Sequence, residues 1–215
     1  MIPLWLHLSS VAWVCLSIAC AALVGLDFVR HPQRMWIMYP VWPLTLLYLG
    51  PLGLWFYRYA GRGPGTRAQT PFWQSVLKGS MHCGAGCALG DVVGEWLASL
   101  AGIRILGSDL LTRYTFAFVL AYAFGIFFQY FSIAPMRQLS FRAGMAAAIK
   151  VDTLSLLAFE VGMFAWMAVT QLLLPGLEPA RVEYWFMMQL AMILGLATTF
   201  PVNWWLLRKG WKERM

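Results

Sequence analysis

Apolar residues form long runs along this chain, separated by short clusters rich in arginine, glycine and proline. An α-helix needs about 20 mostly apolar residues to cross the roughly 30 Å hydrocarbon core of a bilayer. Six runs have this length, so we expect about six membrane-spanning helices. They cover residues 2–28, 35–59, 71–100, 111–133, 145–174 and 184–207.

Composition supports this interpretation. Sixty per cent of the residues are hydrophobic, 12% are charged, and the mean hydropathy is +0.65. A soluble domain carries about one quarter charged residues. The chain also lacks a soluble basic patch, which excludes nucleic-acid binding. We therefore expect one all-α, polytopic membrane domain over residues 1–215, with the lipid bilayer as its partner.

The distribution of lysine and arginine predicts an orientation, because cytoplasmic loops carry an excess of both. With six spans and both termini in the cytoplasm, nine basic residues face the cytoplasm and five face outside. The cytoplasmic set is Arg58, Arg62, Arg67, Arg137, Arg142, Arg208, Lys209, Lys212 and Arg214. The outer set is Arg30, Arg34, Arg104, Arg113 and Arg181.

The second run differs from the others because it contains Pro40, Pro43 and Pro51. Each proline removes a backbone hydrogen-bond donor and can bend or interrupt a helix. We expect this span to be kinked or broken.

The third run is the least hydrophobic and contains the densest group of reactive side chains. Cys83, Cys87, Asp91 and Glu95 follow one another at a spacing of four residues, with His82 beside them. On a helix this spacing places thiols and carboxylates along one stripe. We expect this helix to be the functional centre.

Gly86, Gly90 and Gly94 run along the same side of the third helix. Small residues at this spacing let a second helix backbone approach closely. The partner could be another helix of the chain or a second copy, so a homo-oligomer is one possibility.

The fifth run carries Lys150, Asp152 and Glu160. The third and fifth helices run in the same direction, which predicts Asp152 near the depth of Cys83 and Glu160 near that of Asp91. An ionisable side chain at the bilayer centre costs on the order of 3 kcal/mol, so these acids need a partner, a cavity, a proton or a cation. A plainer role for Lys150 is a buried structural bridge to Asp152 or Asp91.

Thiolates favour Cu(I) and related soft ions, whereas carboxylates suit protons or hard cations. Our main hypothesis is a soft-metal site with Cys83 and Cys87 as primary ligands, assisted by His82 or Met81. The residues expected to carry the ion or a coupled proton onward are Asp91, Glu95, Asp152, Glu160, Lys150 and Asn203. The protein would bind Cu(I), or another soft metal ion, and transport it.

Two other functions remain open. The thiol pair would serve a membrane redox protein, although a helical i+4 pair forms a disulfide only with distortion. Alternatively, the polar helix would hold together a non-catalytic scaffold. The chain has no haem-attachment motif, nucleotide-binding loop or serine nucleophile elbow, which argues against an enzyme.

Several motifs also resemble a known family. They are Met81-His-Cys-Gly-Ala-Gly-Cys-Ala-Leu-Gly-Asp91, Phe128-Gln-Tyr130 with Ile133-Ala-Pro-Met-Arg137, Phe159-Glu-Val-Gly-Met163 and Thr199-Phe-Pro-Val-Asn-Trp204. They resemble a family of small bacterial integral-membrane proteins known as a domain of unknown function. The resemblance covers residues 71–215 and leaves 1–60 as a two-helix N-terminal extension. It implies a bacterial inner membrane, and the occurrence of some relatives joined to copper-oxidase-like domains implies copper.

Overall fold

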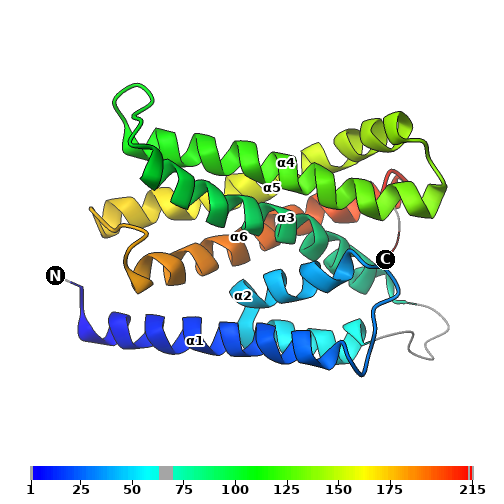
Figure 1. Cartoon of the computed structure of the whole chain (residues 1–215), viewed down its shortest axis with the longest axis horizontal. Helices are drawn as coiled ribbons and strands as arrows, with labels where there is room; N and C mark the ends of the chain where they lie inside the picture. Colours follow the sequence, from blue (N-terminus) through cyan, green and yellow to red (C-terminus); the bar gives the residue numbers. More distant parts are fainter. Residues whose placement is uncertain (1, 63–69, 213, 215) are drawn as a thin grey trace.

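The computed structural model describes residues 2–62, 70–212 and 214, and within them the chain forms six long helices (Figure 1). They are α1 (Leu4–Asp27), α2 (Met38–Phe56), α3 (Phe72–Ala101), α4 (Asp109–Arg137), α5 (Phe141–Leu173) and α6 (Val182–Arg208), and a short π-helix, η1 (Tyr57–Gly61), continues α2. Four of them, α1, α4, α5 and α6, are long and apolar enough to cross a membrane. The predicted all-α fold with six helices is confirmed.

The second helix is a hairpin. Its backbone leaves the helical conformation at Gly50 (φ 52°, ψ −128°), directly before Pro51. In a continuous helix Trp42 and Tyr57 would be about 22 Å apart, at 1.5 Å per residue. Their ring centroids are instead 5.2 Å apart, so the second arm folds back along the first. The positive φ at Gly50 and the missing N–H of Pro51 together make this reversal possible.

Both ends of the hairpin lie where α1 ends. The Gln33 side-chain amide, just before α2, donates to the Gly61 carbonyl at 3.1 Å, and Arg62 forms an ion pair with Asp27 at 2.8 Å. The hairpin tip lies deep in the bundle, because a Cβ atom at Gly50 would be 3.0 Å from the Ser17 hydroxyl in the middle of α1. The α2 segment therefore enters and leaves at one end of the molecule.

This arrangement differs from the expectation of six complete spans. The prolines in residues 35–59 predict a broken helix, as observed, but length and hydropathy do not reveal that the two arms reverse direction. Because the hairpin returns the chain to the end at which it entered, the start of α1 lies at one end of the bundle and the end of α6 near the other (Figure 1).

Glycine allows close contact between α3 and α4. A Cβ atom at Gly86 would be 2.8 Å from the Cα of Gly125, and one at Gly94 would be 2.7 Å from the Cα of Ala117. Gly90 faces the backbone of Ala121 in the same way. The predicted close approach is therefore made within the chain, by α4.

Helices α5 and α6 pack against the remaining side of α3. Thr198 and Thr199 on α6 donate to the carbonyls of Ala158 and Ser155 on α5, at 2.6 and 2.7 Å. The result is a helix pair joined by side-chain-to-backbone hydrogen bonds, with the polar stripe of α3 packed against it.

Candidate functional site

The polar stripe of α3 is buried and faces α5. Cys83, Cys87 and Asp91 are at most 1% exposed. Cys83 interacts with Cys87 and with Asp152 of α5. One turn further along, Cys87 interacts with Glu160 of α5. Thiols and acids from the two helices therefore alternate along one buried line, in the register that parallel spans predict.

The line continues toward the end of α3, since Asp91 interacts with both Glu160 and Glu95. Asp152 is fully buried, and Glu160 is 2% exposed. Neither carboxylate oxygen of Asp91 has a hydrogen-bond partner among the described residues. A buried acid without such a partner is costly in a bilayer, and a bound proton or cation would lower that cost.

Lys212 closes the line at the end where α6 finishes. Its side chain is fully buried, and the ammonium nitrogen lies 3.7 Å from a carboxylate oxygen of Asp152. The ammonium also donates to the side-chain oxygen of Asn203 at 2.8 Å and to the Gly79 carbonyl at 3.3 Å. Three oxygens from α3, α5 and α6 therefore surround one cation supplied by the chain itself.

A turn after α6 brings Lys212 back into the bundle. Gly210 has a φ of 70°, and the Trp211 amide donates to the Leu206 carbonyl at 3.0 Å. This is a Schellman-type helix end, which favours glycine at the left-handed position. The turn reverses the chain, so the side chain two residues later points inward instead of into water.

Asn203 is the centre of the polar network around Lys212. Its side-chain oxygen accepts from Ser155 at 2.8 Å, and its amide donates to Ser80 at 3.0 Å and to Thr199 at 3.3 Å. The amide therefore connects α3, α5 and α6 and fixes the oxygen that Lys212 binds. The sequence predicts Asn203 as a residue of the ion pathway. In the structure it lies beside Lys212, at the end of the line where α6 finishes.

The opposite end of the line meets another positive charge. Glu95 is 2% exposed and interacts with Tyr184 of α6. A guanidinium nitrogen of Arg113, on α4, lies 4.0 Å from a carboxylate oxygen of Glu95. The buried line of thiols and acids, which we call the file, consists of Cys83, Cys87, Asp91, Glu95, Asp152 and Glu160. It runs from Lys212 at one end to Arg113 at the other, so a positively charged side chain lies at each end.

The α2 hairpin also reaches this file. Tyr48, at the tip, is fully buried, and a Cβ atom at Gly84 would be 3.0 Å from its hydroxyl oxygen. The Tyr48 hydroxyl interacts electrostatically with Cys83 and Cys87. The hairpin tip therefore lies against α3 beside the thiol pair, and a Cβ atom at Gly84 would also be 2.9 Å from the Phe159 ring of α5.

The two assisting ligands of the hypothesis lie elsewhere in the core. The Nε2 atom of His82 is 3.0 Å from the Phe128 carbonyl on α4, and the imidazole packs edge-on against the Phe128 ring. His82 is thus directed toward α4. Met81 is buried in the apolar core.

Lys150 does not form the predicted buried bridge. Its side chain is exposed, and the ammonium nitrogen lies 4.8 Å from the centre of the Trp211 ring. Residues two positions apart on a helix point in nearly opposite directions, so Lys150 and Asp152 cannot face the same partner. Lys212 pairs with Asp152 instead, and Lys150 lies outside the file.

Sequence reasoning missed the two residues that close the file, Lys212 and Arg113, as well as Tyr48. One signal for Lys212 was present: Gly210 directly after the helix predicts a chain reversal rather than a straight basic tail. No comparable pattern marks Arg113 or Tyr48, because their partners are distant in sequence.

The donor set limits what the site can hold. Among the described residues, no group of three or more histidine, cysteine or acidic side chains converges to hold a metal ion. The adjacent thiols Cys83 and Cys87 remain as a pair of soft ligands. The arrangement suits an ion that two sulfurs can hold, or protons passed between acids.

A bundle of long apolar helices around a buried file of ionisable residues defines an α-helical integral membrane protein. Residues 72–212 match the family described as a domain of unknown function (DUF4396), and the chain belongs to this family. The matched segment begins with α3 and contains every residue of the file together with Gly79 and Lys212, whereas α1 and the α2 hairpin precede it. No curated protein and no solved structure matches the chain.

Proposed function

We propose that this protein binds a soft monovalent cation such as Cu(I) within the bilayer and passes it along the file between α3 and α5. The observation that carries the proposal is the continuous contact of Cys83 and Cys87 with Asp152 and Glu160. Two sulfurs suit a soft ion, and the neighbouring acids suit the charge that must move with it.

The chemistry of binding involves protons. A thiol binds a metal ion as thiolate, so one Cu(I) ion held by Cys83 and Cys87 releases two protons. Asp152 lies beside the first thiol and Glu160 beside the second, and each carboxylate can accept one proton. The bound state then contains one Cu(I), two thiolates and two neutral acids, so the net charge of these four side chains and the ion changes only from −2 to −1.

Lys212 is a positioning residue in this scheme. Its ammonium binds oxygens of Gly79 and Asn203 and lies 3.7 Å from a carboxylate oxygen of Asp152, which interacts with Cys83. A cation that enters or leaves at this end must displace the ammonium from those oxygens. Movement of the C-terminal segment would therefore open and close the file.

We further infer that the chain crosses the membrane five times, with α2 as a re-entrant hairpin. Twelve of the described lysines and arginines lie at the end where α6 finishes, and three lie at the other end. The three are Arg104, Arg113 and Arg181. This excess of basic residues at one end is larger than the nine against five expected for six spans. It favours a cytoplasmic C-terminus and an external N-terminus, in a bacterial inner membrane.

Of the two other functions, the scaffold loses its main support. Gly86, Gly90 and Gly94 pack against α4 of the same chain and are not available to a second copy. A thiol redox role still competes, because Cys83 and Cys87 are adjacent. The experiment below separates it from metal binding.

The chain contains its own control for a test of the thiol pair. Cys15 and Cys20 on α1 are also free, but within the described part of the chain no interaction connects them to the file. We expect Cys83→Ser/Cys87→Ser to abolish stoichiometric Cu(I) binding by anaerobically purified protein, and Cys15→Ser/Cys20→Ser to retain it. Bound copper is measured by elemental analysis after dialysis against a Cu(I) chelator.

Unchanged copper content in the Cys83/Cys87 variant would refute the metal proposal. Absence of copper in all variants, together with a thiol–disulfide exchange activity that only Cys83→Ser/Cys87→Ser loses, would favour the redox role. For transport, Asp91→Asn and Glu160→Gln should both fold but lose uptake of Cu(I) into proteoliposomes, and Asp91→Asn should retain Cu(I) binding because Asp91 accepts no proton from the thiols.

A further inference from the structure

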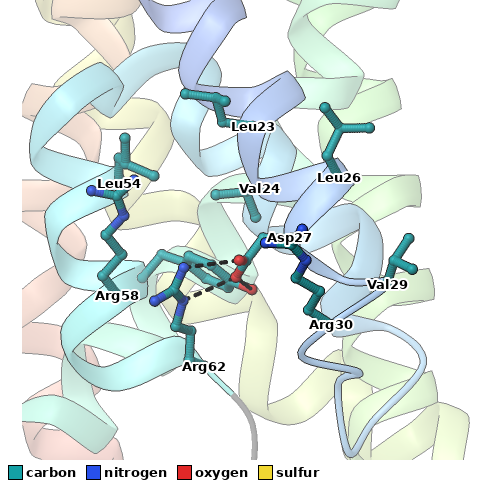
Figure 2. Close-up of a pocket in the computed structure, with 10 residues that line it drawn as sticks. Leu23, Val24, Leu26, Asp27, Val29, Arg30, Leu54, Arg58 and Arg62 are labelled. Atoms are coloured by element: carbon teal, nitrogen blue, oxygen red, sulfur yellow. Dashed lines mark hydrogen bonds and ion pairs between the residues drawn. The ribbon is translucent and has the colours of Figure 1, made fainter.

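A cavity of about 450 Å³ lies at the end of α1, far along the chain from the thiol pair. Asp27 lies at its centre, with Arg58 of η1 and Arg62 directly after η1 on one side and Arg30 from the segment after α1 on the other (Figure 2). The remaining walls are mostly aliphatic side chains of α1 and α2. They include Leu23, Val24, Leu26, Val29 and Leu54.

Only one of the three arginines is neutralised. Arg62 donates two hydrogen bonds to the carboxylate of Asp27, at 2.8 and 3.0 Å, and these raise the pKa of its guanidinium. Within the described part of the chain, no ion pair involves Arg30 or Arg58. The cavity therefore carries two uncompensated positive charges around one closed ion pair.

The π-helix explains why two arginines reach the same cavity. A π-helix has more residues per turn than an α-helix and often marks a functional position. The widened turn of Tyr57–Gly61 directs Tyr57 to Asp27, with a hydrogen bond of 2.9 Å, and lets Arg62 reach the same carboxylate. Arg58 remains on the exposed surface of the same turn.

The aliphatic walls continue onto the outer surface of the bundle. Leu23 is 51% exposed and Leu26 is 72% exposed. Both lie on α1, which is apolar enough to cross a membrane, so these side chains face acyl chains. A ligand in this cavity would contact guanidinium groups at one end and aliphatic side chains and lipid acyl chains at the other.

We infer that this cavity binds one anionic phospholipid, with its phosphate at Arg30 and Arg58 and an acyl chain along Leu23, Leu26 and Leu54. Basic pockets at the cytoplasmic ends of membrane helices bind anionic headgroups in this way. The bound lipid would connect the end of α1 to the second arm of the hairpin whose tip covers the thiols. This inference does not depend on metal binding.

The test uses the purified full-length chain and counts bound lipids by native mass spectrometry. Titration with phosphatidylglycerol should reveal one tight site in the wild type. Arg30→Gln/Arg58→Gln should weaken that site roughly 30-fold, since each arginine near a membrane surface contributes on the order of a factor of five in affinity. Both side chains are exposed, so the variant should fold.

The matched control is Arg142→Gln/Lys209→Gln, which removes the same charge from exposed positions at the same end of the bundle. It should retain the tight site. If both variants lost affinity for phosphatidylglycerol equally, the effect would be one of diffuse surface charge. If both retained the tight site, the cavity would not be the lipid-binding site. Phosphatidylcholine binding as tightly, or inorganic phosphate displacing phosphatidylglycerol, would also overturn the assignment.

Discussion

At the scale of single residues, the main finding is that the buried acids have unequal surroundings. Asp152 faces the ammonium of Lys212 and Glu95 faces Arg113, whereas Asp91 and Glu160 face thiols and each other. The acids at the two ends of the file are therefore compensated by fixed charges, and those in the middle are not. The charges of the two middle acids are therefore the ones that no fixed cation compensates.

This difference predicts the effect of removing Lys212. Lys212→Met should destabilise the protein by about 3 kcal/mol, because loss of one member of a buried pair leaves the other charge uncompensated. Asp152→Asn should also destabilise it, and the double variant should lose less than the sum of the two. Unfolding in sodium dodecyl sulfate measures these free energies.

Lys209→Met is the control, because Lys209 is exposed and three residues away. Its stability should equal that of the wild type. Strict additivity of the Asp152 and Lys212 effects would mean that the pair has no mutual interaction and that Lys212 is buried for another reason.

At the scale of elements, glycine decides which helices touch. The α3 glycines allow α4 to lie against its backbone, and Gly125 on α4 leaves room for Asp152, whose carboxylate oxygen would be 3.1 Å from a Cβ atom there. Close packing of α4 thus helps bring α3 and α5 near enough for thiols and acids to meet. The small-residue pattern therefore serves the site indirectly.

The glycines of α3 differ in how much room surrounds them, which makes a sharp comparison possible. A Cβ atom at Gly90 would collide with the backbone of Ala121, whereas one at Gly79 would be 3.6 Å from the flexible side chain of Lys212. Gly90→Ala should cost roughly 1–3 kcal/mol, as overpacking does. Gly79→Ala should be neutral or stabilising by up to about 1 kcal/mol, because alanine favours helix.

Thermal unfolding in detergent would compare the two variants directly. If Gly90→Ala were as stable as Gly79→Ala, α3 and α4 would not be in backbone contact at this position, and the proposed support for the thiol–acid file would be lost.

At the scale of the whole molecule, the α2 hairpin changes the topology. It returns the chain to the end where α1 finishes, so α3 starts at that end. The loops carrying Arg30 and Arg34 then share a side with the C-terminus. Under six spans these residues and the C-terminus lie on opposite sides, so the two topologies are experimentally distinct.

Labelling of single cysteines with a membrane-impermeant maleimide distinguishes them. In a Cys15→Ser background, Arg34→Cys and Lys209→Cys should both react only from the cytoplasmic side, and Ile103→Cys only from outside. These three positions are exposed, and the remaining native cysteines are buried. Reaction of Arg34→Cys from outside would support six spans and contradict the re-entrant hairpin.

The sequence by itself determined the all-α class, the approximate limits of six helices and the presence of a polar stripe on α3, because hydropathy and helical periodicity are local properties. It also predicted a break in α2, since proline acts locally. Only the tertiary structure decided that the break is a reversal, that Lys212 and not Lys150 meets Asp152, and that the glycines serve α4. Each of these depends on which distant segments lie together, and no local pattern contains that information.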